Sequence, residues 1–325
     1  MQSLELPGLF DLQVNGFGGV DFNAPSLSAD RCAEALERMR PTGVTRCLPT
    51  LITSSFEDFA ANARVLARMN DPAIAGIHME GPYLAADDGP RGAHPRAHVI
   101  AASVEDFNRR QDAAGGRIVL VTLAPEVPGA IPLIDHLVSS GVRVAVGHTA
   151  ASARQIVDAI HAGVTLATHL GNGCAQMLPR HPNPIWELLA ADGIFASLIL
   201  DGHHLPAATA KAMARAKGPG RTILITDAIA AAGCTPGSYT IGGVACVLGT
   251  DGRVSLPGTP YLAGSSLTLD RAIGNMVRFS GFSFDEVIPM ASTIPARYLG
   301  TATRGTLTCD WDAAASELHV RAVRV

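Results

Sequence analysis

The sequence predicts an α/β protein, a (β/α)8 barrel of the TIM type with a reduced accessory β-sheet from its C-terminal segment. Three observations predict it: eight short apolar runs rich in β-branched residues, helical segments between them, and chemically active side chains directly after several runs. Near-continuous apolar strands are typical of a parallel sheet buried on both faces. A closed barrel gathers the carboxyl ends of all its strands around one pocket.

The eight apolar runs are expected to be the barrel strands. The segments between them have helical spacing, and Ser or Thr precedes most of them with acids in the first turn, as caps and the helix dipole favour. The first run is followed by VNGFGG, which is no G-x-G-x-x-G, so a barrel is favoured over an open nucleotide-binding sheet. The predicted strands are 8–14, 44–51, 73–79, 117–123, 143–147, 164–169, 195–200 and 222–226, and helices include 26–40, 54–69, 103–114 and 149–163.

The pattern changes after the eighth run. Residues 238–256 read as short antiparallel strands around a TDG turn, and residues 305–325 as a terminal hairpin. Helices are expected at 265–280, 284–292 and 294–299. We therefore predict a catalytic barrel over 7–300 and a small accessory β region from 301–325, joined by 1–6 and by part or all of 238–256. One vestigial sheet, built mostly from 238–256 and 305–325, is expected rather than a full two-sheet sandwich.

Composition limits the partners. A net charge of -4 with 17% charged residues provides no basic stripe for nucleic acid and no Lys/Arg run for an anionic membrane. The six cysteines are widely spaced with no Cys-x-x-Cys pair, which favours free thiols in a reducing compartment. The N-terminus lacks a leader pattern, and no stretch approaches the ~20 apolar residues that span a bilayer. A cytoplasmic protein acting on a small molecule is expected.

Three candidate metal ligands follow predicted strands three, five and six: Glu80, His148 and His169. A single histidine after a strand is more often structural, but three ligand types at equivalent barrel positions converge over the barrel centre. Two imidazoles and one carboxylate, with a fourth position open to water, form a standard hydrolytic metal site. We expect one divalent ion per chain, Zn²⁺ first, with Fe²⁺, Co²⁺ or Mn²⁺ as alternatives.

Asp227 stands at the end of the eighth predicted strand and would face the same pocket. A carboxylate there can take a proton from an attacking water and deliver it to a departing amine, which is the acid/base work of amide hydrolysis. The structural alternative is a helix N-cap for the following turn. Asp201 also follows a strand, but the sequence assigns it no role.

An ordered series of motifs runs from Pro7 to about Gly300: PGLFDLQVNGFGG, HMEGPYL, RGAHP, VGHTAA, THLGNG, DGHHLP, LITDAIAAAG and LAGSSLTL. Each string alone is weak, but eight in order are specific. The series resembles that of the N-acetylglucosamine-6-phosphate deacetylases of the amidohydrolase superfamily.

The resemblance implies that Glu80, His148 and His169 bind the catalytic metal and that Asp227 is the acid/base. Many amidohydrolases have a His-x-His pair after strand one, where this chain has the amides of Gln13 and Asn15. Neutral amides are poor transition-metal ligands, so one metal rather than two is expected.

The resemblance also implies a substrate-binding set. His94 would polarise the scissile carbonyl, with a structural loop histidine as the equal alternative. A guanidinium from Arg180, in this family often supplied by the partner subunit, would complete a phosphate site and favours a homodimer. The other expected substrate contacts are Ala93, Asn172, Gly173, His204, Leu262, Ala263 and Gly264.

The chain departs from the family pattern after strand six, where THLGNGCAQM replaces the usual THL-x-NAM string. The expected activity is metal-dependent removal of the acetyl group from an N-acetylated amino-sugar phosphate, first of all N-acetylglucosamine 6-phosphate, giving the amino-sugar phosphate and acetate. The altered loop keeps other substrates open: N-acetylgalactosamine 6-phosphate, an unphosphorylated N-acyl sugar or an N-acyl amino acid. A non-catalytic sugar-phosphate-binding barrel is the alternative from another class.

Overall fold

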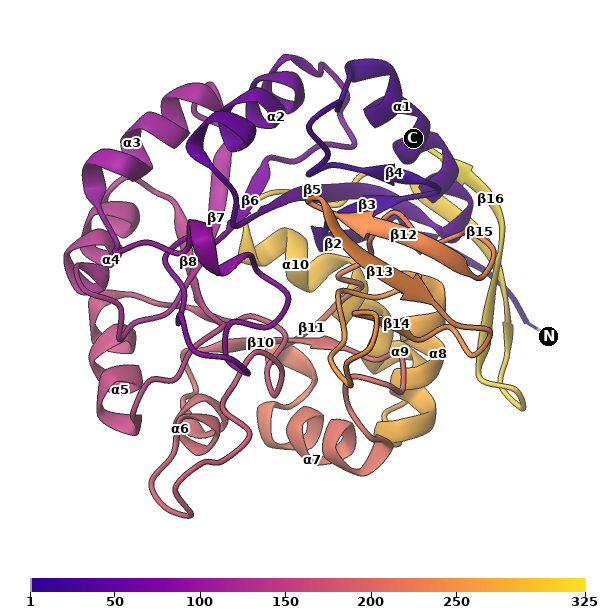
Figure 1. Cartoon of the computed structure of the whole chain (residues 1–325). Helices are drawn as coiled ribbons and strands as arrows, with labels where there is room; N and C mark the ends of the chain where they lie inside the picture. The colour runs from indigo at the N-terminus through magenta and orange to yellow at the C-terminus, as the bar shows by residue number, and fades with distance from the viewer. Residues whose placement is uncertain (1) are drawn as a thin grey trace.

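Eight parallel strands roll into a nearly closed barrel in the computed structural model, which describes residues 2–325. They pair in chain order, so all eight predicted strands are present and adjacent to their sequence neighbours (Figure 1). Their side chains are almost all buried, as near-continuous apolar runs require. The strands are β2 (Leu9–Val14), β5 (Val44–Ile52), β6 (Ile77–Glu80), β7 (Ile118–Leu123), β8 (Arg143–Val146), β9 (Leu166–Ala167), β10 (Phe195–Ile199) and β11 (Thr222–Ile225).

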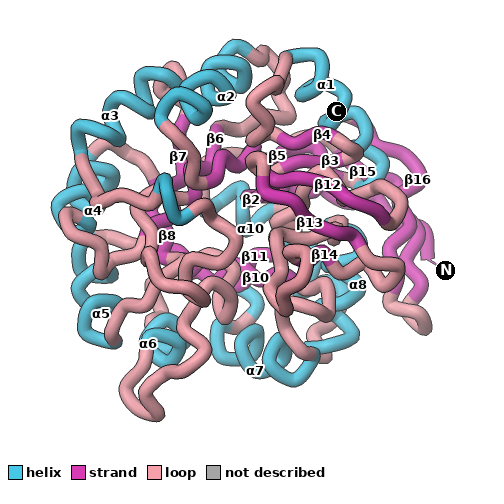
Figure 2. The backbone as a smooth tube through the Cα atoms, viewed as in Figure 1, coloured by secondary structure: helices cyan, strands magenta, loops and turns pink. Residues whose placement is uncertain are grey.

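Helices surround the barrel as an outer ring (Figures 1 and 2). The predicted capping residues are confirmed, because the side chains of Ser28, Ser55, Ser103 and Ser152 each accept a hydrogen bond from a backbone N–H of the first helical turn. The helices of this ring are α1 (Ala29–Met39), α2 (Phe56–Arg68), α3 (Val104–Ala113), α4 (Ala130–Ser139), α5 (Ala153–Ala162), α6 (Pro184–Ala190), α7 (Ala207–Lys217) and α8 (Leu269–Ser280), followed by the short α9 (Phe284–Val287) and α10 (Thr293–Tyr298). Within residues 2–325, no helix has the length and apolarity to cross a membrane.

The barrel closes where β2 meets the end of β11. The Asp227 N–H donates to the Gln13 carbonyl at 2.9 Å, and the Asn15 N–H to the Ala228 carbonyl at 2.7 Å. Below them, the Thr226 hydroxyl donates to the buried Asp11 carboxylate at 2.5 Å. Burial raises the pKa of Asp11 to about 7, although the hydrogen bonds that this carboxylate accepts act in the opposite direction.

This buried carboxylate predicts a pH-dependent stability. A group whose pKa is raised on folding contributes stability that is complete below its unfolded pKa and is lost as the pH rises through its folded pKa, here about 7. For Asp11→Asn, we expect the free energy of unfolding relative to the parent to rise by about 2 kcal/mol between about pH 5.5 and about pH 7.5. Urea unfolding of both proteins at the two pH values measures this. A difference that does not change with pH would contradict it.

Two small antiparallel sheets accompany the barrel. The N-terminal strand β1 (Gln2–Pro7) pairs with β15 (Thr306–Asp312), which pairs with β16 (Glu317–Arg324), so the terminal hairpin is confirmed. Residues 237–255 do not join this sheet. Contrary to the expectation of one shared sheet, they form their own, consisting of β12 (Gly237–Ile241), β13 (Val244–Leu248) and β14 (Val254–Ser255).

The two sheets are separate because they lie at opposite ends of the barrel strands. β1 leads into the amino end of β2, whereas β12–β14 follow the carboxyl end of β11. The latter sheet packs on Ile52 and Ile229 through Ile241, Cys246 and Leu248, and it lies over one side of the barrel mouth (Figure 1). A further short ribbon, β3 (Gly16–Phe17) with β4 (Val20–Asp21), follows β2. All six cysteines are free, as expected.

Candidate metal centre

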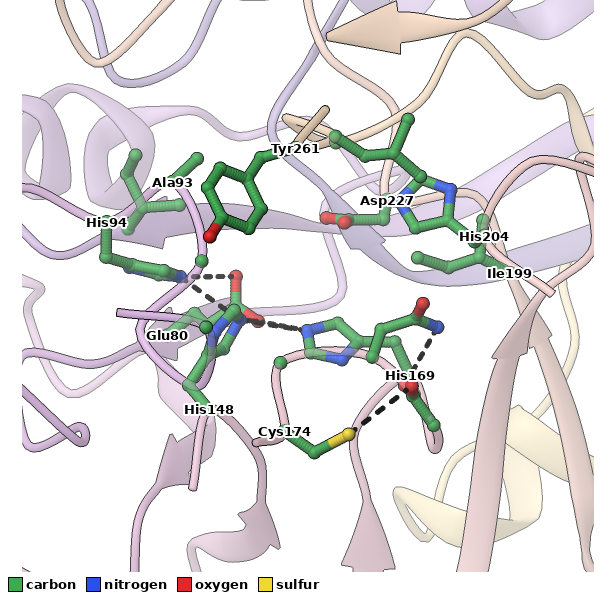
Figure 3. Close-up of a pocket in the computed structure, with 18 of the residues that line it drawn as sticks. Glu80, Ala93, His94, His148, His169, Cys174, Ile199, His204, Asp227 and Tyr261 are labelled. Atoms are coloured by element: carbon green, nitrogen blue, oxygen red, sulfur yellow. Dashed lines mark hydrogen bonds and ion pairs between the residues drawn. The ribbon is translucent and has the colours of Figure 1, made fainter. Parts of the chain in front are cut away.

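A cavity of about 570 Å³ opens at the carboxyl end of the barrel strands. Its wall contains five side chains that the sequence singled out for chemistry, and Figure 3 shows them pointing into one site: Glu80, His94, His148, His169 and Asp227. Residues up to 147 positions apart in the chain (80 to 227) thus share one site, as the barrel argument predicted.

A left-handed backbone conformation orients three of these side chains. His148, His169 and Asp227 have φ values of 50°, 32° and 52°, and only one other non-glycine residue among 2–325 has a positive φ. This left-handed region costs free energy for residues with a Cβ and is typical of functional sites. Each of the three lies two residues beyond its strand, so the turn that ends the strand places the side chain over the barrel centre.

The geometry of Glu80, His148 and His169 fits a divalent metal ion. Oε1 of Glu80 lies 3.0 Å from Nε2 of His169 and 3.3 Å from Nε2 of His148, and the two imidazole nitrogens are 3.0 Å apart. Ligands about 2.0–2.1 Å from a tetrahedral ion are separated by about 3.3 Å, so the three atoms could share one ion. The three residues are the one His/Cys/Asp/Glu group of this kind found among residues 2–325.

Neighbouring groups orient and ionise two of these candidate ligands. Nδ1 of His148 lies 3.0 Å from the Pro90 carbonyl and donates its proton there, which leaves the Nε2 lone pair free for a metal. Burial acts to raise the pKa of Glu80, but hydrogen bonds and charge from His148 and His169 outweigh it and hold the pKa well below its usual range. The carboxylate is therefore ionised and ready to coordinate.

The strand-one amides donate hydrogen bonds in the site. Nε2 of Gln13 donates to Oε1 of Glu80 at 2.9 Å and to Oδ1 of Asp227 at 3.0 Å, and Nδ2 of Asn15 donates to the same Oδ1 at 2.6 Å. An amide nitrogen carries no free lone pair for a metal. Gln13 and Asn15 thus orient the two carboxylates, which agrees with one ion rather than two.

Asp227 and His94 flank the three candidate ligands (Figure 3). Burial, assisted by the charge of Glu80, raises the pKa of Asp227 to about 6. Burial and the neighbouring His148 lower the pKa of His94 well below its usual range, so its ring is neutral. Nδ1 of His94 lies 3.0 Å from the Thr53 hydroxyl and 3.4 Å from the Thr53 N–H, while Nε2 lies 3.2 Å from Nε2 of His148.

Comparison with known proteins connects this geometry to a family. A model of the amidohydrolase family matches residues 5–316. An N-acetylglucosamine-6-phosphate deacetylase from Bacillus subtilis is 33% identical over 320 residues, covering 96% of this chain and 79% of the relative. The chain belongs to the amidohydrolase family.

Other relatives of this amidohydrolase differ in the sugar that their names specify. An N-acetylgalactosamine-6-phosphate deacetylase from Shewanella is 32% identical and covers 94% of this chain and 77% of its own. The structure of a Mycobacterium smegmatis N-acetyl-D-glucosamine-6-phosphate deacetylase, an Asp-to-Ala mutant in complex with N-acetyl-D-glucosamine-6-phosphate, superposes with a TM-score of 0.91 at 32% identity, covering 99% of this chain and 85% of that one.

Most of the expected substrate contacts of the amidohydrolase line the cavity, namely Ala93, Asn172, Gly173, His204, Leu262 and Gly264. Two do not. Ala263 is 1% exposed and packs in the apolar cluster under β12–β14. Arg180 is exposed in the loop before α6 and does not line the cavity formed by its own chain.

The sequence reasoning missed several lining residues, including Tyr261, Cys174 and Gln176. Tyr261 directly precedes the LAG string, so its position beside a matched motif was an available signal. Cys174 and Gln176 lie in the departing loop after strand six, for which the family pattern gave no guide. Thr53, which holds His94, follows a strand but has no distinguishing motif.

Proposed function

We propose that this amidohydrolase removes the acetyl group from an N-acetylated amino-sugar 6-phosphate, first of all N-acetylglucosamine 6-phosphate, and releases acetate. The observation that carries the proposal is the buried group of Glu80, His148 and His169 with Asp227 in the same cavity. The names of the relatives support the choice of substrate. N-acetylgalactosamine 6-phosphate is the second candidate, favoured by the relative from Shewanella.

In this proposal, a side chain is assigned to each chemical step. A divalent ion bound by Glu80, His148 and His169, with Zn²⁺ expected, would supply Lewis-acid stabilisation and lower the pKa of water. Asp227 takes a proton from the attacking water as that water's oxygen bonds to the acetyl carbon. The same carboxyl then delivers the proton to the sugar nitrogen as the C–N bond breaks, and a pKa of about 6 suits both tasks.

His94 stabilises the tetrahedral oxyanion. The Thr53 N–H points to Nδ1 of His94, so that nitrogen accepts and the proton of the neutral ring lies on Nε2. Nε2 faces the metal group, where the scissile carbonyl oxygen would develop negative charge. A fixed neutral donor here lowers the barrier without adding a charge to the buried site.

Recognition of the sugar phosphate uses the cavity wall and, in this proposal, a second subunit. Asn172, Gly173 and His204 contact the sugar phosphate, and Arg180 reaches the phosphate of the partner's substrate in a cytoplasmic homodimer. The exposed loop that carries Arg180 lies beside α6 (Figure 2). The same loop carries Met177, which is 88% exposed. Backbone contacts come from Ala93, Leu262 and Gly264, whereas the buried Ala263 is left out of the set.

A substrate panel tests the proposal. We expect acetate release from N-acetylglucosamine 6-phosphate to exceed that from the unphosphorylated sugar, with Arg180→Gln lowering kcat/KM about 10- to 100-fold for the phosphorylated compound alone. Arg154→Gln, at a solvent-exposed arginine of α5, is the matched control. Light scattering reports whether the protein is a dimer.

The panel separates the alternatives. Preference for the galactosamine epimer would select the second candidate, and preference for unphosphorylated or N-acyl amino acid substrates would displace both. Sugar-phosphate binding without acetate release by the metal-loaded protein would favour a non-catalytic binding barrel.

A further inference from the structure

Asp201 forms a buried pair with His204 at the edge of the cavity. It lies two residues beyond β10, in the loop that leads to α7. The side chains of His204 and Asp201 are 7% and 9% exposed, and His204 lines the cavity beside Asp227 (Figure 3). The sequence placed Asp201 after a strand, but the hydrolytic machinery described above does not use it.

The carboxylate of Asp201 is the acceptor in each of its hydrogen bonds. Its Oδ1 accepts the backbone N–H groups of His203 at 2.9 Å and His204 at 2.8 Å, and its Oδ2 lies 2.7 Å from Nδ1 of His204. Burial acts to raise the pKa of Asp201, but the hydrogen bonds that the carboxylate accepts, first of all the one from the His204 side chain, lower the pKa below its usual value. An ionised carboxylate only accepts, so Nδ1 of His204 must carry a proton.

The other ring nitrogen of His204 is free. Nε2 makes no hydrogen bond to another residue within 2–325, while the ring forms part of the cavity wall. With the proton fixed on Nδ1, Nε2 of a neutral ring presents a lone pair to the cavity. A sugar offers hydroxyl groups, which can donate to such an acceptor.

We propose that Asp201 is a positioning residue: it holds the His204 ring with its proton on Nδ1, so that Nε2 accepts a hydrogen bond from a hydroxyl group of the sugar substrate. The choice of a sugar rests on the proposed function. The placement of the proton rests on the hydrogen bonds alone.

The variant Asp201→Asn reverses this placement. The two backbone N–H groups require an acceptor, so the amide oxygen of the new side chain must face them. The amide NH₂ then faces Nδ1 of His204, which must accept, and the proton of the neutral ring moves to Nε2. A donor replaces the acceptor in the cavity with almost no change in shape, the same logic by which an Asp-to-Asn change in a catalytic triad selects the wrong tautomer.

Nitrogen NMR of the zinc-loaded, ¹⁵N-histidine-labelled full chain tests the pair directly. We expect the His204 signals, identified by their loss in His204→Gln, to show a protonated Nδ1 in the parent and a protonated Nε2 in Asp201→Asn. His203→Gln is the matched control, because its side chain bonds to the Asp251 carbonyl outside the cavity. A neutral His204 ring with its proton on Nε2 in the parent would overturn the proposal, even if Asp201→Asn failed to fold.

Kinetics supply the second readout. For Asp201→Asn, we expect KM for the sugar substrate to rise about 10- to 100-fold with kcat changed by less than about 3-fold, because a binding contact is lost and the reacting atoms are untouched. An unchanged KM would refute the substrate contact. If the parent protein hydrolysed no N-acetyl sugar, the proposed function would fail, while the NMR result would still decide whether Asp201 fixes the His204 proton.

Discussion

We expect Asp227→Asn to lower kcat by about 10³-fold, within the range of about 10²–10⁴ that a positioned acid/base contributes. The amide keeps the size of the carboxyl and still offers an oxygen to Gln13 and Asn15, whose nitrogens donate to Oδ1. It cannot take a proton from water at neutral pH. The three candidate metal ligands are unchanged, so we expect metal content to stay near one ion per chain. Acetate release and metal analysis on the same preparation measure both quantities.

The control for this variant is Asp158→Asn, on the outer face of α5, where the carboxylate pairs with the exposed Arg154. It should retain parental kinetics. Hydrolysis by Asp227→Asn at the parental rate would show that another group moves the proton. Loss of metal together with activity would instead show that Asp227 is a metal ligand, which would also contradict the acid/base assignment.

The barrel and its metal group were predictable because both depend on local patterns. Apolar runs define the strands, and the barrel rule converts three residues after three strands into one site, so Glu80, His148 and His169 needed no pairing information. The orientation of these side chains was not predicted. The positive φ values of the two histidines come from the turns that end the strands, which residue type alone does not reveal.

Features that depend on long-range register were harder to predict. The pairing of the N-terminal segment with the terminal hairpin was predicted correctly, but nothing in residues 237–255 reveals that they pair only with one another, so the single accessory sheet was wrong in its membership. The cavity-lining residues show the same limit: Leu262 lines the cavity, whereas Ala263 points into the apolar cluster, because neighbours in an extended segment face opposite sides. A resemblance in sequence identifies a motif, but it does not show which side chains of that motif face the cavity.

Removing the metal gives the second large effect. Glu80 is 2% exposed between two imidazoles, and a bound cation would balance its buried charge. We expect chelation to abolish acetate release. It should also lower the free energy of unfolding by about 4 kcal/mol relative to protein in a free metal concentration of about 1,000 times the dissociation constant of the ion. Zn²⁺ added back to the parent should restore both quantities. Denaturant unfolding with and without chelator measures the second.

Glu80→Gln separates the role of the carboxylate from that of the fold. The amide retains the size of the side chain but loses its charge and an anionic ligand, so added Zn²⁺ should restore neither activity nor the lost stabilisation. Glu317→Gln, at an exposed position of β16, is the matched control and should respond to chelation and Zn²⁺ as the parent does. Full activity of chelated parent protein shown to be free of metal would refute the metal-dependent mechanism. If Zn²⁺ restored Glu80→Gln to the parental rate, the metal-dependent mechanism would stand, but Glu80 would not be one of the metal ligands.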